Sequence, residues 1–127
     1  MPSRIKIIAG KVSALAELNE SRTARAVLAA LPIESRAQRW GEEVYFSIPV
    51  QAGLEADARA DVEVGEIGYW PEGPAFCIFF GRTPASLGQK PRAASAVNIL
   101  GKVKGDAKLF GQVKSGAAIR LELGVRS

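Results

Sequence analysis

Short runs in which apolar and polar residues alternate recur along most of the chain, a pattern typical of β-strands with one buried face. The most regular run has apolar side chains at Val44, Phe46, Ile48 and Val50. Similar but less regular runs predict further strands at residues 4–9, 12–18, 33–39, 62–70, 97–103 and 117–123. Gly10 and Lys11 separate the first two, which predicts a hairpin or a pair of short strands there.

The spacing of apolar residues becomes helical in only two places. Ala24, Val27, Leu28 and Leu31 form one helical stripe; either Asn19 or Ser21 is suited to cap its start, and Pro32 ends it. A second short helical pattern follows Asp106, which is a predicted N-cap, and runs to Val113. The sequence therefore predicts two short helices among many strands.

Residues 75–80 are apolar on both faces and follow a tight turn at residues 71–74. Such a strand must be central in a sheet, or must line a closed barrel whose outside is covered. Residues 51–60 are predicted to be a connection with room for a helical turn. Residues 81–96 are rich in Gly, Pro, Ser and Ala and are predicted to be a long loop, of a length often functional or mobile.

These elements predict a mostly β fold of about eight strands and two short helices, arranged as a closed barrel or a sandwich. The chain has 127 residues, which fits a single domain over residues 1–127. We find neither an internal repeat nor a domain boundary.

Composition limits the expected cellular location and the kinds of partner. The chain is 47% hydrophobic and 24% charged, has no apolar run long enough to span a bilayer, and shows no export signal at its N-terminus, so we expect a cytoplasmic protein without membrane contact. The net charge of +4 permits an anionic partner. The basic residues are scattered, however, which argues against nucleic-acid binding.

The residue types exclude most familiar catalytic sites. There is no histidine, so Ser-His-Asp, Cys-His and His-zinc sites are absent, and the single cysteine, Cys77, is predicted to be a small buried hydrophobe. Ser86 with Lys90 would be a nucleophile and base only if the lysine were desolvated. The spacing of the glycines does not match a phosphate-binding loop. We expect no cofactor.

Four carboxylates cluster along the chain, at Glu55, Asp57, Asp61 and Glu63. They lack the ordered spacing of a calcium loop, so we interpret them as a solvated face and expect no metal site.

Three blocks resemble the prokaryotic cyclophilin-like domain family, whose function is not established: residues 65–71 (GEIGYWP), 77–86 (CIFFGRTPAS) and 97–106 (VNILGKVKGD). The match runs in order from about residue 5 to residue 123. It implies a closed cyclophilin-type β-barrel with helices at its ends. True cyclophilins use an arginine, a histidine, and aromatic and amide side chains around a proline-shaped groove. This chain has no histidine and no match to their signature sequences, so prolyl isomerase activity is not expected.

A candidate binding site combines aromatic residues with polar residues of the loop that follows them. Its predicted ligand-binding residues are Tyr69, Trp70, Phe79, Phe80, Arg82, Thr83, Arg92 and Asn98. Aromatic walls with one or two guanidinium groups suit a small anionic ligand or a peptide. The alternative is that the aromatic residues belong to the core, that Arg82 pairs locally, and that Asn98 satisfies loop backbone groups.

The sequence thus favours a non-catalytic domain that binds a small molecule or peptide, and no residue is assigned a catalytic role. Two other functions remain open at this point. One is an enzyme, either an atypical prolyl isomerase or one whose chemistry the sequence does not reveal. The other is an interaction module that forms homo-oligomers through an edge strand or an apolar patch.

Overall fold

The computed structural model describes residues 3–124 and shows a mostly β fold. Its elements in chain order are β1 (Ser3–Ala9), β2 (Val12–Leu18), α1 (Arg22–Ala30), β3 (Ile33–Arg36), β4 (Gln38–Arg39), β5 (Glu43–Ser47), β6 (Arg59–Asp61), β7 (Glu66–Trp70), β8 (Ala75–Phe79), β9 (Arg92–Val103), the 3₁₀ helix η1 (Ala107–Gln112) and β10 (Ala118–Leu123). No helix within residues 3–124 is long and apolar enough to cross a membrane.

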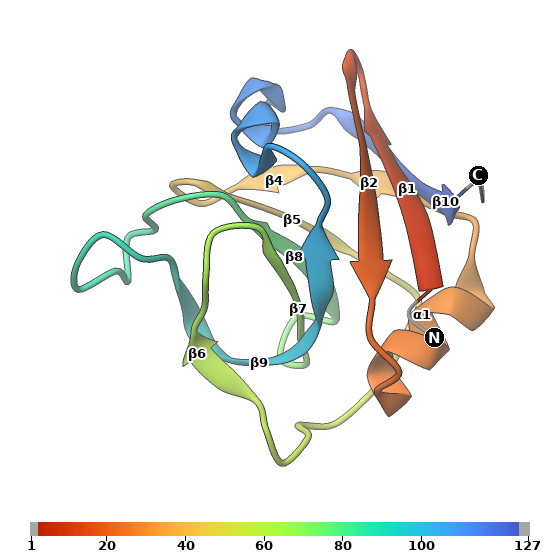
Figure 1. Cartoon of the computed structure of the whole chain (residues 1–127), viewed down its shortest axis with the longest axis horizontal. Coiled ribbons are helices and arrows are strands. Elements are labelled where there is room, and N and C mark those ends of the chain that lie inside the picture. Colours follow the sequence, from red (N-terminus) through yellow and green to blue (C-terminus); the bar gives the residue numbers. More distant parts are fainter. Residues whose placement is uncertain (1–2, 125–127) are drawn as a thin grey trace.

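The strands form one antiparallel sheet in the order β3-β10-β1-β2-β9-β7-β8-β5-β4, and β6 pairs with β9 (Figure 1). The ring of strand pairs is not closed in the described residues, because β3 pairs with β10 and β4 pairs with β5 but not with each other. Only Ala37 separates these two end strands, and its N–H and C=O bond to Ala117 and Gly116. The predicted mostly β class is confirmed, whereas closure of the barrel is not.

Local sequence accounts for most element ends. β1 and β2 form the predicted hairpin, with Gly10 in the left-handed region at its turn. The Ser21 side chain caps α1 by accepting a hydrogen bond from the Ala24 N–H, and α1 ends at Ala30, before Pro32. Asp106 caps η1, as predicted, through the Lys108 N–H.

Two predicted connections differ from the structure. Residues 51–60 contain one hydrogen-bonded turn, from the Ala58 N–H to Glu55 O at 3.1 Å, but no helix, and they lead into β6. Residues 92–96 belong to β9 and not to a long loop, because pairing of Asp61 with Arg92 and of Arg59 with Val97 extends that strand. The loop between β8 and β9 is therefore residues 80–91, and it projects to one side, away from α1 (Figure 1).

The sheet buries apolar side chains on both faces at β8, as its sequence predicts. Phe76, Ile78 and Phe80 join the main core, together with most buried residues of β1, β2 and β10. The alternate residues of β8 join a second cluster on the other face, whose buried members are Val62, Ala75, Cys77, Phe79, Ala93 and Val97. The first half of β9 and the segment at β6 cover the outside of the sheet here.

Candidate functional site

A small cavity of about 200 Å³ lies beside the second cluster. We call it the outer pocket, and it is lined by Trp40, Glu43, Tyr45, Trp70, Cys77, Ala93, Ala94 and Val97. Three of these side chains are aromatic and half-buried, so they reach both the cavity and solvent. Apolar walls with a few polar groups are typical of small-molecule sites.

Strand register brings the lining residues together from distant parts of the chain. Glu43 and Tyr45 lie on the outer face of β5, opposite Phe79 and Cys77 of β8. β7 adds Trp70, which pairs with Ala75 at the other side of β8. The residues that face the main core are the alternate ones, so the period-two pattern itself sends this set outward.

Gly68 lets β9 approach the outer pocket closely. A Cβ atom at Gly68 would lie 2.6 Å from Val97 Cγ2, so the Val97 side chain occupies the space that any other residue would fill. The β7–β9 register shifts by one residue between Ile67 and Gly68, which is a β-bulge. Close approach of β9 at Gly68 therefore places Val97 in the pocket wall.

The indole of Trp70 is held by two contacts, one of which is supported by a further hydrogen bond. Its Nε1–H donates to Ser95 Oγ at 2.7 Å, and Ser95 Oγ donates to Glu72 Oε2 at 2.5 Å. Gly73 packs against the ring, since a Cβ there would lie 2.7 Å from Trp70 Cζ3. One pocket wall is thus fixed in place without any ligand.

Glu43 is the unusual polar residue of the site, because its side chain is 5% exposed. Burial raises the pKa of Glu43 to about 7, although a hydrogen bond from the Cys77 thiol opposes this effect. No salt bridge among residues 3–124 includes Glu43, and no basic side chain contributes to its pKa. The carboxyl group can therefore be neutral or charged near neutral pH.

Cys77 is 2% exposed, which confirms the predicted small buried hydrophobe. Burial raises the pKa of its thiol well above the ordinary value, and the nearby Glu43 carboxylate raises it further. The thiol therefore stays protonated. It donates to Ala75 O at 3.9 Å, and its nearness to Glu43 favours the charged form of that carboxyl group.

The structure does not gather the predicted ligand-binding residues into one cavity. Tyr69 and Phe80 lie in the main core, on the inner face of the sheet. The Tyr69 hydroxyl donates to Val50 O at 2.6 Å and accepts from the Ala52 N–H at 3.2 Å, so it anchors the segment after β5. Phe79 belongs to the second cluster, on the outer face. Of the eight predicted residues, Trp70 alone lines the outer pocket.

The polar members of that set also have other partners. Arg82 is exposed. Thr83 is buried, and its hydroxyl donates to Arg92 O at 2.5 Å. Arg92 Nη1 pairs with Asp61 Oδ1 at 3.0 Å, which joins the start of β9 to β6. These contacts organise the loop of residues 80–91.

Asn98 is a fully bonded buried amide. Its Nδ2 donates to Thr23 Oγ1 at 3.1 Å and to Gly53 O at 2.9 Å, and its Oδ1 accepts from the Glu55 N–H at 2.8 Å. It thereby ties the loop of residues 51–58 to β9 and to the first turn of α1. This geometry matches the alternative in which Asn98 satisfies loop backbone groups.

Replacement of Asn98 with alanine is expected to lower the free energy of unfolding by about 2 kcal/mol, because the buried amide makes three hydrogen bonds, one of them to the buried Thr23 hydroxyl, and all three are lost. Urea denaturation followed by circular dichroism measures this change. Gln38→Ala, at an exposed amide on β4, is the control and should change stability by less than about 0.5 kcal/mol. Equal stability of the two variants would contradict the structural role of Asn98.

The remaining candidate groups are engaged with one another. Ser86 Oγ donates to Lys90 O at 2.7 Å, while Lys90 Nζ pairs with Glu63 at 2.9 Å, so the two side chains do not form a nucleophile and base. The Glu55 carboxylate accepts hydrogen bonds from the Thr23 hydroxyl and N–H. The predicted acidic cluster is therefore divided among separate partners.

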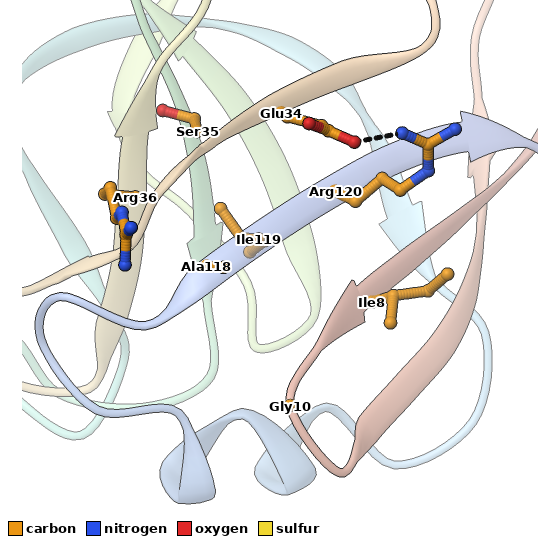
Figure 2. A pocket seen from close by; sticks show the side chains of 8 residues that line it. All are labelled: Ile8, Gly10, Glu34, Ser35, Arg36, Ala118, Ile119 and Arg120. Atoms are coloured by element: carbon orange, nitrogen blue, oxygen red, sulfur yellow. Dashed lines mark hydrogen bonds and ion pairs between the residues drawn. The ribbon is translucent and has the colours of Figure 1, made fainter.

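A wider hollow of about 610 Å³ lies over β1, β3 and β10. Figure 2 shows the ion pair between Glu34 and Arg120 at this hollow. Arg36 donates instead to Gly116 O at 3.1 Å. Another hollow, of about 710 Å³, lies between α1 and residues 51–57. Neither has an aromatic lining residue, so the outer pocket is the better site despite its smaller volume.

Sequence reasoning missed Glu43, Trp40 and Tyr45. A usable signal was present, since the alternation at Val44 and Phe46 sends Glu43 and Tyr45 to the outer face. A strand apolar on both faces, such as β8, requires that outer face to be covered. Together these two observations predict a buried carboxyl group at Glu43. They apply to the same place only because β5 pairs with β8, and the sequence does not show that pairing.

Within residues 3–124 the protein is a mostly β domain built on one antiparallel sheet with two short helices. The chain belongs to the cyclophilin-like family, whose model matches residues 3–122. The predicted resemblance is confirmed.

Two solved structures have the same fold. The hypothetical protein AF2241 from Archaeoglobus fulgidus, solved in solution, is 37% identical, with a TM-score of 0.82 over 97% of this chain and 95% of that protein. McbB, solved in complex with tryptophan, is 14% identical, with a TM-score of 0.67 over 97% of this chain and 45% of McbB, and shows the fold alone. No curated protein sequence matches the chain.

Proposed function

We propose that this protein is a small-molecule-binding domain and that the outer pocket is its ligand site. The observation that carries the proposal is the combination of three aromatic side chains with a buried carboxyl group in one cavity of about 200 Å³. A cavity of this size takes a molecule of one or two rings. Burial of a carboxyl group lowers the stability of the fold. A residue with such a cost is expected to serve a functional site, because it does not help folding.

Preorganisation supports the proposal. The Trp70 indole is already bonded to Ser95 and packed on Gly73, so binding does not require ordering of that wall. The complex of McbB with tryptophan shows that a protein of this fold is found with a small molecule, and the present proposal extends that property to this chain.

A thermal-shift and ligand-observed NMR screen of small one- and two-ring compounds, including tryptophan, tests this function. We expect at least one compound to raise the melting temperature saturably, because ligand binding stabilises the native state. Ala94→Trp should abolish that shift, since Ala94 is exposed at the pocket lining and a large ring there fills the cavity.

Two variants locate the site. Ala118→Trp places the same ring in the hollow of Figure 2 and should leave binding unchanged. Arg82→Ala should also leave binding unchanged, whereas the binding site predicted from the sequence, which includes Arg82, requires a loss of binding. Binding that survives Ala94→Trp but is lost in Arg82→Ala would contradict the outer pocket as the site.

A further inference from the structure

The outer pocket holds a carboxyl group that has no cationic partner among residues 3–124. Glu43 is 5% exposed, and the neighbouring polar side chain that favours its charged form is the neutral Cys77 thiol. Arg92, next to Ala93 in the lining strand, is already paired with Asp61. Ionised carboxylates buried in proteins are normally paired with a positive charge, so the pocket is electrostatically incomplete when Glu43 is charged.

The walls around this carboxyl group are suited to a positive charge. Trp40, Tyr45 and Trp70 line the same small cavity as Glu43. The faces of aromatic rings carry negative partial charge, and cages of such rings with a nearby carboxylate recognise organic ammonium ions. Lysine and arginine do not occur among the lining residues, so an anion would meet a carboxylate without a compensating group.

We propose that the ligand class of the outer pocket is a small organic cation, in which an ammonium group pairs with the Glu43 carboxylate between Trp40, Tyr45 and Trp70. The inference rests on the proposed function and specifies its ligand. No covalent step is involved. The bound cation supplies the positive charge that none of the lining side chains provides, and the ordered Trp70 ring supplies one wall of the cage.

Binding of the cation is coupled to ionisation of Glu43. The other titratable groups that line the pocket are Tyr45, on the same strand, and Cys77, on β8; β7 and β9 contribute Trp70, Ala93, Ala94 and Val97, which do not titrate. Glu43 is therefore the group that changes charge near neutral pH. Since its pKa is about 7, affinity for a cation should rise about tenfold from pH 6 to pH 8.

The test compares choline with 3,3-dimethylbutan-1-ol, a neutral molecule of nearly the same shape in which carbon replaces the quaternary nitrogen. Affinities for the full chain are measured by NMR titration at pH 6 and pH 8, up to 10 mM of each probe. Benzylamine and benzyl alcohol form a second matched pair with a primary ammonium group. Variants are Glu43→Gln, Trp70→Ala and the control Glu63→Gln, at an exposed carboxyl group outside the pocket.

We expect a cation of at least one pair to bind at least about tenfold more tightly than its neutral counterpart at pH 8. Glu43→Gln should reduce the affinity for the cation about tenfold and remove the dependence of affinity on pH. Trp70→Ala should reduce the affinity but keep its dependence on pH. Glu63→Gln should change neither the affinity nor its dependence on pH.

Equal binding of the neutral counterparts would overturn the cation proposal and leave the small-molecule function standing. An absence of binding by both cations to folded protein at 10 mM would also overturn the cation proposal. The broader function is decided separately by the compound screen and Ala94→Trp.

Discussion

Replacing Gly101 with alanine is expected to lower the free energy of unfolding by about 4 kcal/mol, a loss comparable with the most severe single substitutions. Gly101 lies in β9, paired with Leu18 of β2 on one side and with Ile67 of β7 on the other. A Cβ atom there would lie 1.9 Å from the Glu17 carbonyl oxygen, and φ is +155°. Because the contact is with backbone, no side-chain rotation relieves it, and the β2–β9 pairing must separate.

Urea denaturation of the variant and the native chain measures this loss. Gly105→Ala is the matched control, since Gly105 also has positive φ, +85°, but a Cβ there meets nothing within 4 Å. The control carries backbone strain alone and should cost about 1 kcal/mol. If Gly101→Ala lowered the free energy of unfolding no more than Gly105→Ala does, the result would contradict the close approach of β2 to β9 at Gly101.

Glu43→Gln is expected to stabilise the protein at high pH. The free energy of unfolding of the variant minus that of the native chain should be about 3 kcal/mol larger at pH 8 than at pH 4. Burial raises the folded-state pKa of Glu43 from 4.5 to about 7. Between these two values the folded state holds a proton that the unfolded state has released, so native stability falls as pH rises through this window. Below pH 4.5 both states are protonated, and glutamine mimics the neutral acid at every pH.

Denaturant unfolding of both proteins at half-unit steps from pH 4 to pH 8 measures the difference. The same series with Glu63→Gln, at an exposed carboxyl group, should give a difference that changes by less than about 0.5 kcal/mol. A difference between native chain and Glu43→Gln that stays flat with pH would show that Glu43 is solvated and not buried. Choline at saturating concentration should reduce the penalty at pH 8, because the bound cation stabilises the charged carboxylate.

Elements whose causes are local could be predicted. Alternation and the Gly10 turn predicted the β1–β2 hairpin, and the Ser21 cap with Pro32 bounded α1. Apolar residues on both faces of residues 75–80 predicted a covered central strand, and the structure places buried residues on each face of β8. The family resemblance along the chain was confirmed by the model that matches residues 3–122.

The site could be predicted only in part, and Trp70 shows why. Its aromatic type and its place at a strand end marked it as a candidate, and it lines the outer pocket. Tyr69 and Phe80 were grouped with it because they are near in sequence, but successive strand residues point to opposite faces, so both entered the main core. The sequence predicts a loop at Arg92, whereas pairing with β6 makes this residue the first of β9.

The sequence by itself determined which residues alternate and where the chain turns, since these depend on neighbours within a few residues. Its composition determined which common catalytic groups are absent. Tertiary structure alone decided that Glu43 is buried, because its burial follows from the pairing of β5 with β8 and from the cover that β9 provides. Alternation along β5 places Glu43 on the outer face but does not show which strand covers it. The raised pKa of Glu43, and the pocket it shares with Trp40, Tyr45 and Trp70, exist only when strands from distant parts of the chain meet.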